Sequence, residues 1–307
     1  MNTKILKVIL IVSVLLPIII TGCSKKHKVD IVVYKKEIEQ WQAKRAEGLK
    51  KEDGWLSLAG LFWMKEGENK MGTDSYNTII FPPERSLKYA GLIYLKKGEL
   101  RLKVAKGVEI KVKDSLVSEM KLQSDQSGKG EPTVMNLGSL TFYVIKRGEQ
   151  FGVRVKDKDN PARLNFKGLE YFSIDPRWRI DAKFEPYNPP KIIPIVNVLN
   201  QVSNDTCPGA IAFEVEGKTY RLDALKEGTE LFIIFHDETS GKETYGMGRY
   251  HYTDLPDSNN NVVIDFNKAY NPPCAFTVFA TCPMPPEQNY LTLRIEAGEK
   301  KYAESEH

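Results

Sequence analysis

Short apolar or alternating runs, each broken by Gly, Asn, Asp or Pro, fill the chain after Gly54 and limit its fold more than any other feature. Alternation with a period of two puts apolar side chains on one face of a strand, and the interrupting residues are those that turns favour. No second long amphipathic helix pattern follows, which argues against a doubly wound α/β sheet. We therefore expect a mainly β protein.

The predicted strands fall into two groups, which indicate two packed β-rich halves over residues 54–157 and 158–307. The many short hairpins of the first half favour a β-sandwich. Its strands are expected at 56–63, 78–81, 91–96, 99–104, 109–112, 119–122, 140–147 and 150–156. Those of the second half are expected at 180–185, 192–199, 209–215, 218–223, 231–235, 245–252, 262–266 and 291–296.

A helical period precedes the strands. Tyr34, Ile38, Trp41 and Ala46 recur at spacings of three to five among Lys, Glu and Gln, which is typical of an amphipathic helix. We expect one N-terminal helix within residues 31–53.

The first 22 residues predict export rather than a fold element. Lys4 and Lys7 precede an apolar run over 8–20 that ends at Gly22-Cys23. The run is short for a bilayer span, which needs roughly 20 residues. It resembles the bacterial lipobox, which implies removal of residues 1–22 and acylation of Cys23, with palmitate as a typical chain. We expect a lipoprotein of the cell envelope, held by its lipid anchor to a membrane, with the folded part outside the cytoplasm.

Charge excludes one class of partner. The full chain has 44 Lys and Arg against 40 Asp and Glu, and removal of residues 1–22 takes away two lysines. Such a balanced chain gives no reason to expect nucleic-acid binding. Residues 23–30 are expected to be a tether, whose basic tract at 24–28 either lies on anionic headgroups or stays solvated.

Residues 66–83 resemble the start of a forkhead-associated (FHA) domain. In that family an arginine follows the glycine, but here Thr73 follows Gly72. Where the family has a serine and a histidine, this chain reads Ser86-Leu87-Lys88-Tyr89, without the histidine. The resemblance implies a β-sandwich without phosphopeptide binding.

Five longer stretches together resemble a bacterial and archaeal family known as domain-of-unknown-function family 1684. The resemblance implies no chemistry, but it implies that the stretches form one unit. They are residues 54–72, 147–161, 175–190, 231–249 and 265–300.

The cysteines leave two interpretations open. In an exported protein Cys274 and Cys282, eight residues apart, are either a disulfide, if the chain between them folds back, or two buried thiols among apolar neighbours. Cys207 has no obvious partner. A cysteine nucleophile would need a base such as His236 or His251, but the sequence around His236 is also typical of a polar hairpin turn.

Standard catalytic and metal-binding signatures are absent from the sequence. It has no Gly-x-Ser-x-Gly elbow, P-loop or His-Glu-x-x-His motif, and its cysteines and histidines lack the spacing of zinc ligands. We expect neither a metal nor a cofactor.

A polar cluster before the Pro-rich C-terminal loop is the best remaining candidate site. It consists of Arg249, Asp265, Asn267, Tyr270 and Asn271. Arginine, a carboxylate, amides and a phenol can bind a small anion or carbonyl group. The same residues can equally form a buried ion pair and Asx turns that hold an irregular loop.

The leading functional hypothesis is a binding or structural module at the membrane surface, acting on a small polar ligand or envelope component. The alternative is a hydrolase-like enzyme with a pocket near Arg249, residues 265–271 and Cys274. An enzyme should bring these side chains together in a water-filled pocket, whereas a structural loop should bury them with internal partners.

Overall fold

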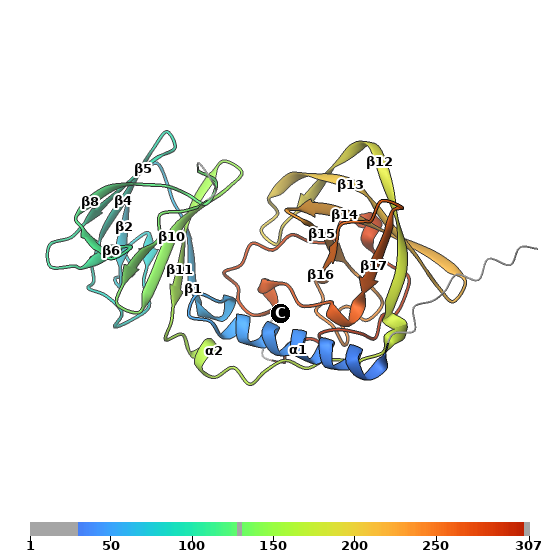
Figure 1. The fold of residues 1–307 in the computed structure, drawn as a ribbon. Coiled ribbons are helices and arrows are strands. Elements are labelled where there is room, and N and C mark those ends of the chain that lie inside the picture. The colour runs from blue at the N-terminus through green and yellow to red at the C-terminus, as the bar shows by residue number, and fades with distance from the viewer. Residues whose placement is uncertain (1–29, 128–130, 304–307) are drawn as a thin grey trace, which may run out of the picture.

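The computed structural model describes residues 30–127 and 131–303. Two β-rich halves stand next to each other, and one long helix, α1 (Ile31–Lys50), runs beneath the second half with its C-terminal end toward the first (Figure 1). The mainly β fold with an N-terminal helix, predicted from the sequence, is confirmed. The proposed signal segment and Cys23 lie outside the described residues, and no helix among the described residues is long and apolar enough to cross a membrane.

Local sequence explains where α1 begins and which face it buries. The Asp30 carboxylate accepts hydrogen bonds from the backbone N–H groups of Val32 and Val33, so it caps the helix. Tyr34, Ile38 and Leu49 are the buried residues. Tyr34 and Ile38 are four residues apart, which places them on one face of the helix.

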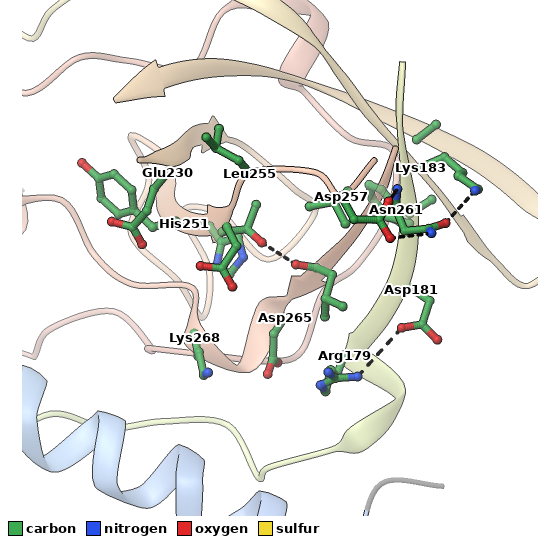
Figure 2. A pocket seen from close by; sticks show the side chains of 18 of the residues that line it. Arg179, Asp181, Lys183, Glu230, His251, Leu255, Asp257, Asn261, Asp265 and Lys268 are labelled. Carbon is green, nitrogen blue, oxygen red and sulfur yellow. Dashed lines mark hydrogen bonds and ion pairs between the residues drawn. The ribbon is translucent and has the colours of Figure 1, made fainter. Parts of the chain in front are cut away.

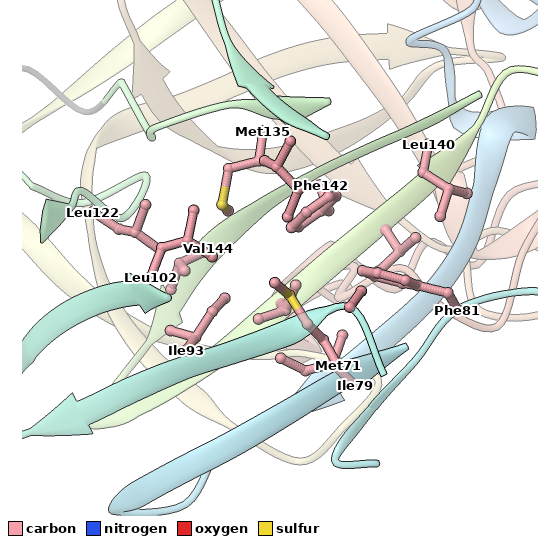
Figure 3. Packing of buried hydrophobic residues seen from close by; sticks show 14 of the residues in the cluster. Met71, Ile79, Phe81, Ile93, Leu102, Leu122, Met135, Leu140, Phe142 and Val144 are labelled. Carbon is pink, nitrogen blue, oxygen red and sulfur yellow. The ribbon is translucent and has the colours of Figure 1, made fainter. Parts of the chain in front are cut away.

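The first half is a β-sandwich whose two sheets enclose one core (Figure 3). One sheet has the order β1-β11-β10-β9-β6-β7 and the other the order β3-β2-β4-β5-β8. The strands are β1 (Leu58–Trp63), β2 (Gly67–Gly72), β3 (Ile79–Ile80), β4 (Gly91–Lys96), β5 (Glu99–Val104), β6 (Ile110–Val112), β7 (Ser115–Val117), β8 (Glu119–Leu122), β9 (Met135–Leu137), β10 (Leu140–Arg147) and β11 (Gln150–Asp157).

The second half is one antiparallel sheet of order β16-β15-β14-β13-β12-β17, which we call the barrel half. Its strands are β12 (Arg179–Val196), β13 (Val202–Val215), β14 (Lys218–Glu227), β15 (Glu230–Phe235), β16 (Arg249–Asp254) and β17 (Asn261–Asp265). The two edge strands, β16 and β17, lie near each other (Figure 1). They form no ladder, but the Thr253 hydroxyl donates a hydrogen bond to the Val263 carbonyl oxygen. The sheet therefore curls into an incompletely closed barrel.

A crossing segment joins the halves. It starts with the short helix α2 (Pro161–Leu164), which Asn160 caps, and ends with the 3-10 turn Pro176–Trp178. Between them the Phe172 N–H donates to the Gly298 carbonyl oxygen. The C-terminal residues thus tie the segment to the barrel half.

The barrel half differs from the prediction in two ways: two expected strands form one, and a third is absent. The strands expected at 180–185 and 192–199 are parts of β12, because a register shift between Pro186 and Lys191 lets the strand continue past its prolines. The strand expected at 291–296 is absent among the described strands. The backbone of residues 291–296 instead forms hydrogen bonds with the loop after β15. The Leu291 N–H donates to the His236 carbonyl oxygen, and the Ile295 N–H donates to the Asp237 carboxylate.

Candidate functional site

A cleft of about 1330 Å³ opens between α1 and the incompletely closed side of the barrel half (Figure 2). Strands β12, β16 and β17 supply most of its wall, and α1 supplies Glu37 and Trp41. We call this cavity the acidic cleft, because eight carboxylate side chains but only three lysine and arginine side chains line it. The carboxylates are Glu37, Asp181, Glu185, Glu214, Glu230, Asp254, Asp257 and Asp265.

A second cavity of about 450 Å³ continues from the first under the C-terminal part of α1. We call it the aromatic recess. None of the described residues that line it carries a carboxylate, and its two charged residues are the cations Lys44 and Arg45. Its aromatic residues are Trp41, Trp55, Phe232, Tyr250, Tyr252 and Tyr270.

The acidic cleft and the aromatic recess share three aromatic residues, namely Trp41, Tyr252 and Tyr270. The rings pack in a continuous wall. Tyr252 is stacked on Phe232 at a centroid distance of 4.7 Å and lies nearly parallel to Tyr270 at 6.4 Å, and Trp41 is 6.4 Å from Tyr270. Such offset pairs hold their rings in fixed orientations. The shared wall is therefore a preformed surface for a flat or apolar group.

Tyr34 fastens the N-terminal part of α1 to the barrel half. Its hydroxyl donates to both carboxylate oxygens of Asp265, at 3.0 and 3.1 Å, and accepts a hydrogen bond from Asn267 Nδ2 at 2.8 Å. Asn267 also donates to the Asp175 carbonyl oxygen. Burial raises the pKa of the Asp265 carboxyl, and these hydrogen bonds partly oppose that shift.

Arg45 fastens the C-terminal part of α1. Its Nε is 2.9 Å from Glu299 Oε1 and its Nη2 donates to the Asn271 carbonyl oxygen at 3.0 Å. The guanidinium also lies over the Tyr270 ring, 4.6 Å from the centroid, where a cation is attracted by the ring face. Because Glu299 already balances the charge of Arg45, Lys44 is the uncompensated cation of the recess.

His251 is a buried polar residue of the acidic cleft. It is 1% exposed, and neither ring nitrogen makes a well-aligned hydrogen bond to a described residue. Burial lowers its pKa to about 4, and the charges of Lys268 and Arg249 act in the same direction. The nearby Lys268 backbone partly opposes this shift. The imidazole is therefore neutral at pH 7, with one nitrogen able to donate and one able to accept a hydrogen bond.

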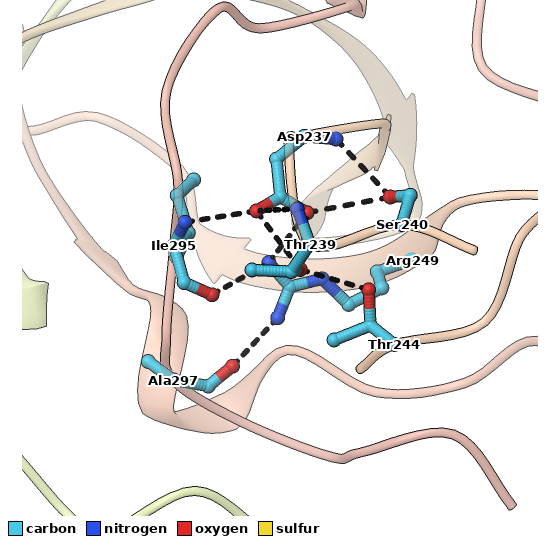
Figure 4. Close-up of polar contacts among 7 residues, drawn as sticks. All are labelled: Asp237, Thr239, Ser240, Thr244, Arg249, Ile295 and Ala297. Atoms are coloured by element: carbon cyan, nitrogen blue, oxygen red, sulfur yellow. Dashed lines mark hydrogen bonds and ion pairs between the residues drawn. The ribbon is translucent and has the colours of Figure 1, made fainter. Parts of the chain in front are cut away.

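Two other candidates from the sequence lie away from both cavities. Arg249 is fully buried in the loop network of Figure 4, where it pairs with Asp237 at 2.9 Å and donates to the carbonyl oxygens of Ile295 and Ala297. Asn271 is also fully buried, and it donates through its backbone to Glu299 and through its side chain to the Lys300 carbonyl oxygen. Both residues hold the C-terminal loop in place.

The five predicted residues therefore do not meet in one cavity. Asp265 and Tyr270 line the acidic cleft, and Tyr270 also lines the aromatic recess. Arg249, Asn267 and Asn271 are at most 2% exposed and bond to other parts of the protein.

Cys207, Cys274 and Cys282 are free and buried. The Cys274 N–H donates to Cys282 Sγ at 3.0 Å, and both residues pack in an apolar cluster with Tyr245 and Ala280. Of the two interpretations from the sequence, the structure has the buried thiols. Neither thiol lines the acidic cleft or the aromatic recess.

The histidine proposed as an alternative base stands elsewhere. His236 directly follows β15 and stacks on Tyr290 at 4.7 Å. The residues after it form the turn network of Asp237, Thr239 and Ser240, held by hydrogen bonds from the two hydroxyl groups to the Asp237 carboxylate. Among the described residues no group of three or more His, Cys, Asp and Glu side chains is arranged to hold a metal ion.

Residues 164–300 match the family described as "Protein of unknown function (DUF1684)". An uncharacterised protein of Haloarcula marismortui, with a solution NMR structure, is 31% identical over 46% of this chain and 80% of that chain, with a TM-score of 0.39. The chain belongs to the DUF1684 family. The family match is shorter than the resemblance in the sequence, which starts at residue 54.

Two other solved structures are similar to a part of the chain. Two FHA-domain structures, one of FhaA complexed with an intracellular domain and one from work on phosphothreonine-dependent interactions, are each 15% identical to the chain. They cover 31% of this chain and 97% and 92% of their own, with TM-scores of 0.22. No curated protein matches the chain.

The DUF1684 match contains one side of the recess and lacks the other. Tyr252 and Tyr270 belong to the matched residues, whereas Trp41 and Trp55 precede them. The helix and the first turn of the sandwich half therefore complete a cavity that the matched region does not form alone.

Sequence reasoning missed Trp41, Tyr252 and Glu230 as site residues, and it considered His251 only as a partner for a cysteine. One available signal was the alternation in β16, where Tyr250 and Tyr252 must face away from His251. That Trp41 would face Tyr252 across more than 200 residues was not visible in any local pattern.

Proposed function

We propose that this protein is a lipid-anchored protein of the cell envelope that binds a small polar ligand in the acidic cleft and the aromatic recess. The observation that carries the proposal is the shared wall of Trp41, Tyr252 and Tyr270. Aromatic walls with a few polar groups are the usual lining of small-molecule sites, and the recess has an ordinary volume for one.

The hydrogen-bonding capacity of the cavity supports a ligand. Neither indole N–H of Trp41 and Trp55 donates to a described residue, and the Tyr270 hydroxyl also has no such bond. His251 adds two ring nitrogens without well-aligned partners. A site that binds through hydrogen bonds needs such unused groups, since groups already paired internally have little left to offer a ligand.

The anchor would hold this site close to a membrane. The seven residues 24–30 between Cys23 and α1 can span at most about 25 Å when fully extended. α1 itself forms part of both cavities. Acylation of Cys23 would therefore present the ligand site near the lipid surface.

An enzyme that uses His251 is the second candidate, because a neutral imidazole at the floor of a cleft can act as a general base. The hydrolase-like version based on Cys274 has less support, since that thiol packs in an apolar cluster outside both cavities.

The ligand site can be tested with ring-bearing probes on the full-length protein, purified from membranes in detergent. We expect calorimetry to detect binding of at least one of benzyl alcohol, benzylamine and 4-methylbenzoate. Replacing Trp41→Leu or Tyr252→Leu removes a stacking partner and should weaken binding by about threefold to tenfold. Tyr94→Leu, on the exposed face of the sandwich, is the control. If none of the probes binds, or if all three variants behave alike, the proposed site is wrong.

The anchor needs a separate test in cells. An alkyne analogue of palmitate should label the wild-type protein, which should sediment with membranes. Cys23→Ser should abolish both properties. Labelling that persists in this variant would contradict acylation at Cys23.

A further inference from the structure

The acidic cleft and the aromatic recess are lined by side chains of opposite charge, and together they form one site with an anionic and a cationic end. Eight carboxylates and three cations line the acidic cleft, whereas two cations and no carboxylate of the described residues line the aromatic recess. The shared wall of Trp41, Tyr252 and Tyr270 separates the two ends. A ligand that lies along this wall would have one end in an anionic and the other in a cationic environment.

Two elements show the same order of side chains. Along α1, Lys44 lines the recess, Trp41 lines both cavities and Glu37 lines the acidic cleft. Their spacing of three and four residues keeps them on one side of the helix, and Lys44 and Glu37 are separated by about 10 Å along its axis.

β16 repeats this order. Tyr250 lines the recess, Tyr252 lines both cavities and Asp254 lines the acidic cleft. Alternate residues of a strand share one face. The neighbouring strand agrees, because Phe232 pairs with Tyr252 and lines the recess, while Glu230 pairs with Asp254 and lines the acidic cleft.

Two carboxylates at the acidic end have no cation beside them among the described residues. Glu230 and Asp254 lie directly opposite each other on β15 and β16, and neither makes an ion pair or hydrogen bond through its side chain with a described residue. Like charges in this position repel each other. Glu37, by contrast, is neutralised by Lys268 at 2.8 Å. A cationic group of a ligand placed between Glu230 and Asp254 would reduce the repulsion between these two carboxylates.

The cationic end also has an unused charge. Lys44 is exposed and forms no ion pair or hydrogen bond with the described residues, while the charge of Arg45 is balanced by Glu299. Burial is the main cause of the raised pKa of Tyr270, while Arg45 lowers this pKa and Glu299, Glu227 and Glu230 raise it.

An independent observation also points to a ligand in the acidic cleft. His251 is 1% exposed, lines this cleft, and has no well-aligned hydrogen-bond partner for either ring nitrogen among the described residues. A buried donor and acceptor without partners destabilise the protein unless something else satisfies them. His251 faces away from Tyr252 and Asp254 along β16, so a polar group deeper in the acidic cleft, beyond the shared wall, would do so.

We propose that the ligand is a zwitterion, with an ammonium group at Glu230 and Asp254, a ring or other apolar middle on Trp41, Tyr252 and Tyr270, and a carboxylate or phosphate group at Lys44. This inference rests on the proposed function and names the chemical class of its ligand. The aromatic wall suits both the middle of the ligand and its cation, since ring faces attract ammonium groups.

Three probes of matched shape test the charge requirement. 4-(Aminomethyl)benzoate carries both charges on one ring, benzylamine carries only the cation and 4-methylbenzoate only the anion. Calorimetry on the full-length protein in detergent should show that the zwitterion binds about tenfold tighter than either single ion, and that added salt reduces this advantage. Equal affinity of the zwitterion and one single ion would overturn the two-ended site.

Charge variants show which end of the site binds which charged group of the probe. Lys44→Met should weaken 4-methylbenzoate and the zwitterion by about threefold to fivefold and leave benzylamine unchanged. The double variant Glu230→Gln, Asp254→Asn should have the converse effect. Lys106→Met and Glu109→Gln, exposed positions in the sandwich half, are the matched controls.

The outcomes separate the two proposals. If ring probes bind but the charge variants act on all of them alike, the zwitterion is wrong and the binding function stands. If no ring probe binds, including the neutral benzyl alcohol, the binding function itself fails and the zwitterion fails with it.

Discussion

Arg249 and Asp237 form an ion pair in which both side chains are fully shielded from solvent, with Nη2 and Oδ1 2.9 Å apart. The pair joins the start of β16 to the loop after β15 and, through carbonyl oxygens of Ile295 and Ala297, to the C-terminal segment. Removal of one partner leaves the other charge buried and unpaired, which costs about 3–5 kcal/mol. We expect Asp237→Asn to lower the free energy of unfolding by that amount in a urea titration.

A matched pair on the surface provides the control. Arg177 and Asp175 are 2.7 Å apart, but the Arg177 side chain is 82% exposed. Arg177→Gln should leave the urea midpoint close to the wild-type value, because water and salt screen exposed pairs. If Asp237→Asn is as mild as Arg177→Gln, the buried pair does not hold the loop.

The pKa of His251 predicts a specific loss of stability in acid. Its pKa is about 4 in the folded protein, below its ordinary value of 6.5. The unfolded chain therefore binds a proton that the folded protein does not, and the contribution of His251 to stability is complete above pH 6.5 and is lost as the pH falls to 4. This loss is about 3 kcal/mol.

His251→Phe removes this titration and also removes two unsatisfied nitrogens. Urea unfolding of the wild type and the variant between pH 7 and pH 4 should show the wild type losing stability relative to the variant. Asp265 and Glu299, whose pKa values burial raises, act with the opposite sign but are present in both proteins, so they cancel in the difference. A difference that stays constant with pH would contradict the lowered pKa.

Local patterns predicted most of the fold because its strands alternate and its turns carry their usual residues. The strands Gly91–Lys96 and Glu99–Val104 lie where the alternation predicts them, joined by a turn in which Lys97 and Gly98 have positive φ. The errors arise where tertiary contacts replace the pattern. Residues 291–296 alternate like a strand, but the Asp237 carboxylate and the carbonyl oxygen of His236 take their backbone donors.

The candidate site was less predictable, because its parts are remote in sequence. Asp265 and Tyr270 stood out through their polar neighbours, and both line a cavity. Trp41 read only as part of the apolar face of a helix, and Glu230 as the start of a strand. Their role depends on how α1 docks on β15 and β16, which no short pattern encodes.

Tyr34 should control this docking. Tyr34→Phe removes the hydroxyl that bonds to Asp265 and Asn267, which leaves a buried carboxylate with one donor fewer. The expected cost is about 1–3 kcal/mol. Hydrogen exchange should become faster in α1 than in the sandwich half, and probe binding should weaken because Trp41 moves with the helix. Tyr76→Phe, at a position 95% exposed, is the control. Unchanged exchange in α1 would show that other contacts hold the helix.

The buried thiols should react only after the protein opens. Cys207 is fully buried, and Cys274 and Cys282 are 5% and 4% exposed. Burial also raises the pKa of Cys207, which keeps it protonated at neutral pH, and the thiolate is the form that reacts with alkylating agents.

Iodoacetamide should therefore leave these three residues unmodified in the native protein and modify all three in urea. Mass spectrometry of the digested protein gives the extent of reaction at each site. Because labelling then follows the unfolded fraction, the destabilised Asp237→Asn variant should be labelled faster than the wild type under the same native conditions. Fast labelling of native Cys274 would place this thiol in an accessible cavity, and a peptide that links Cys274 to Cys282 would show a disulfide instead of two thiols.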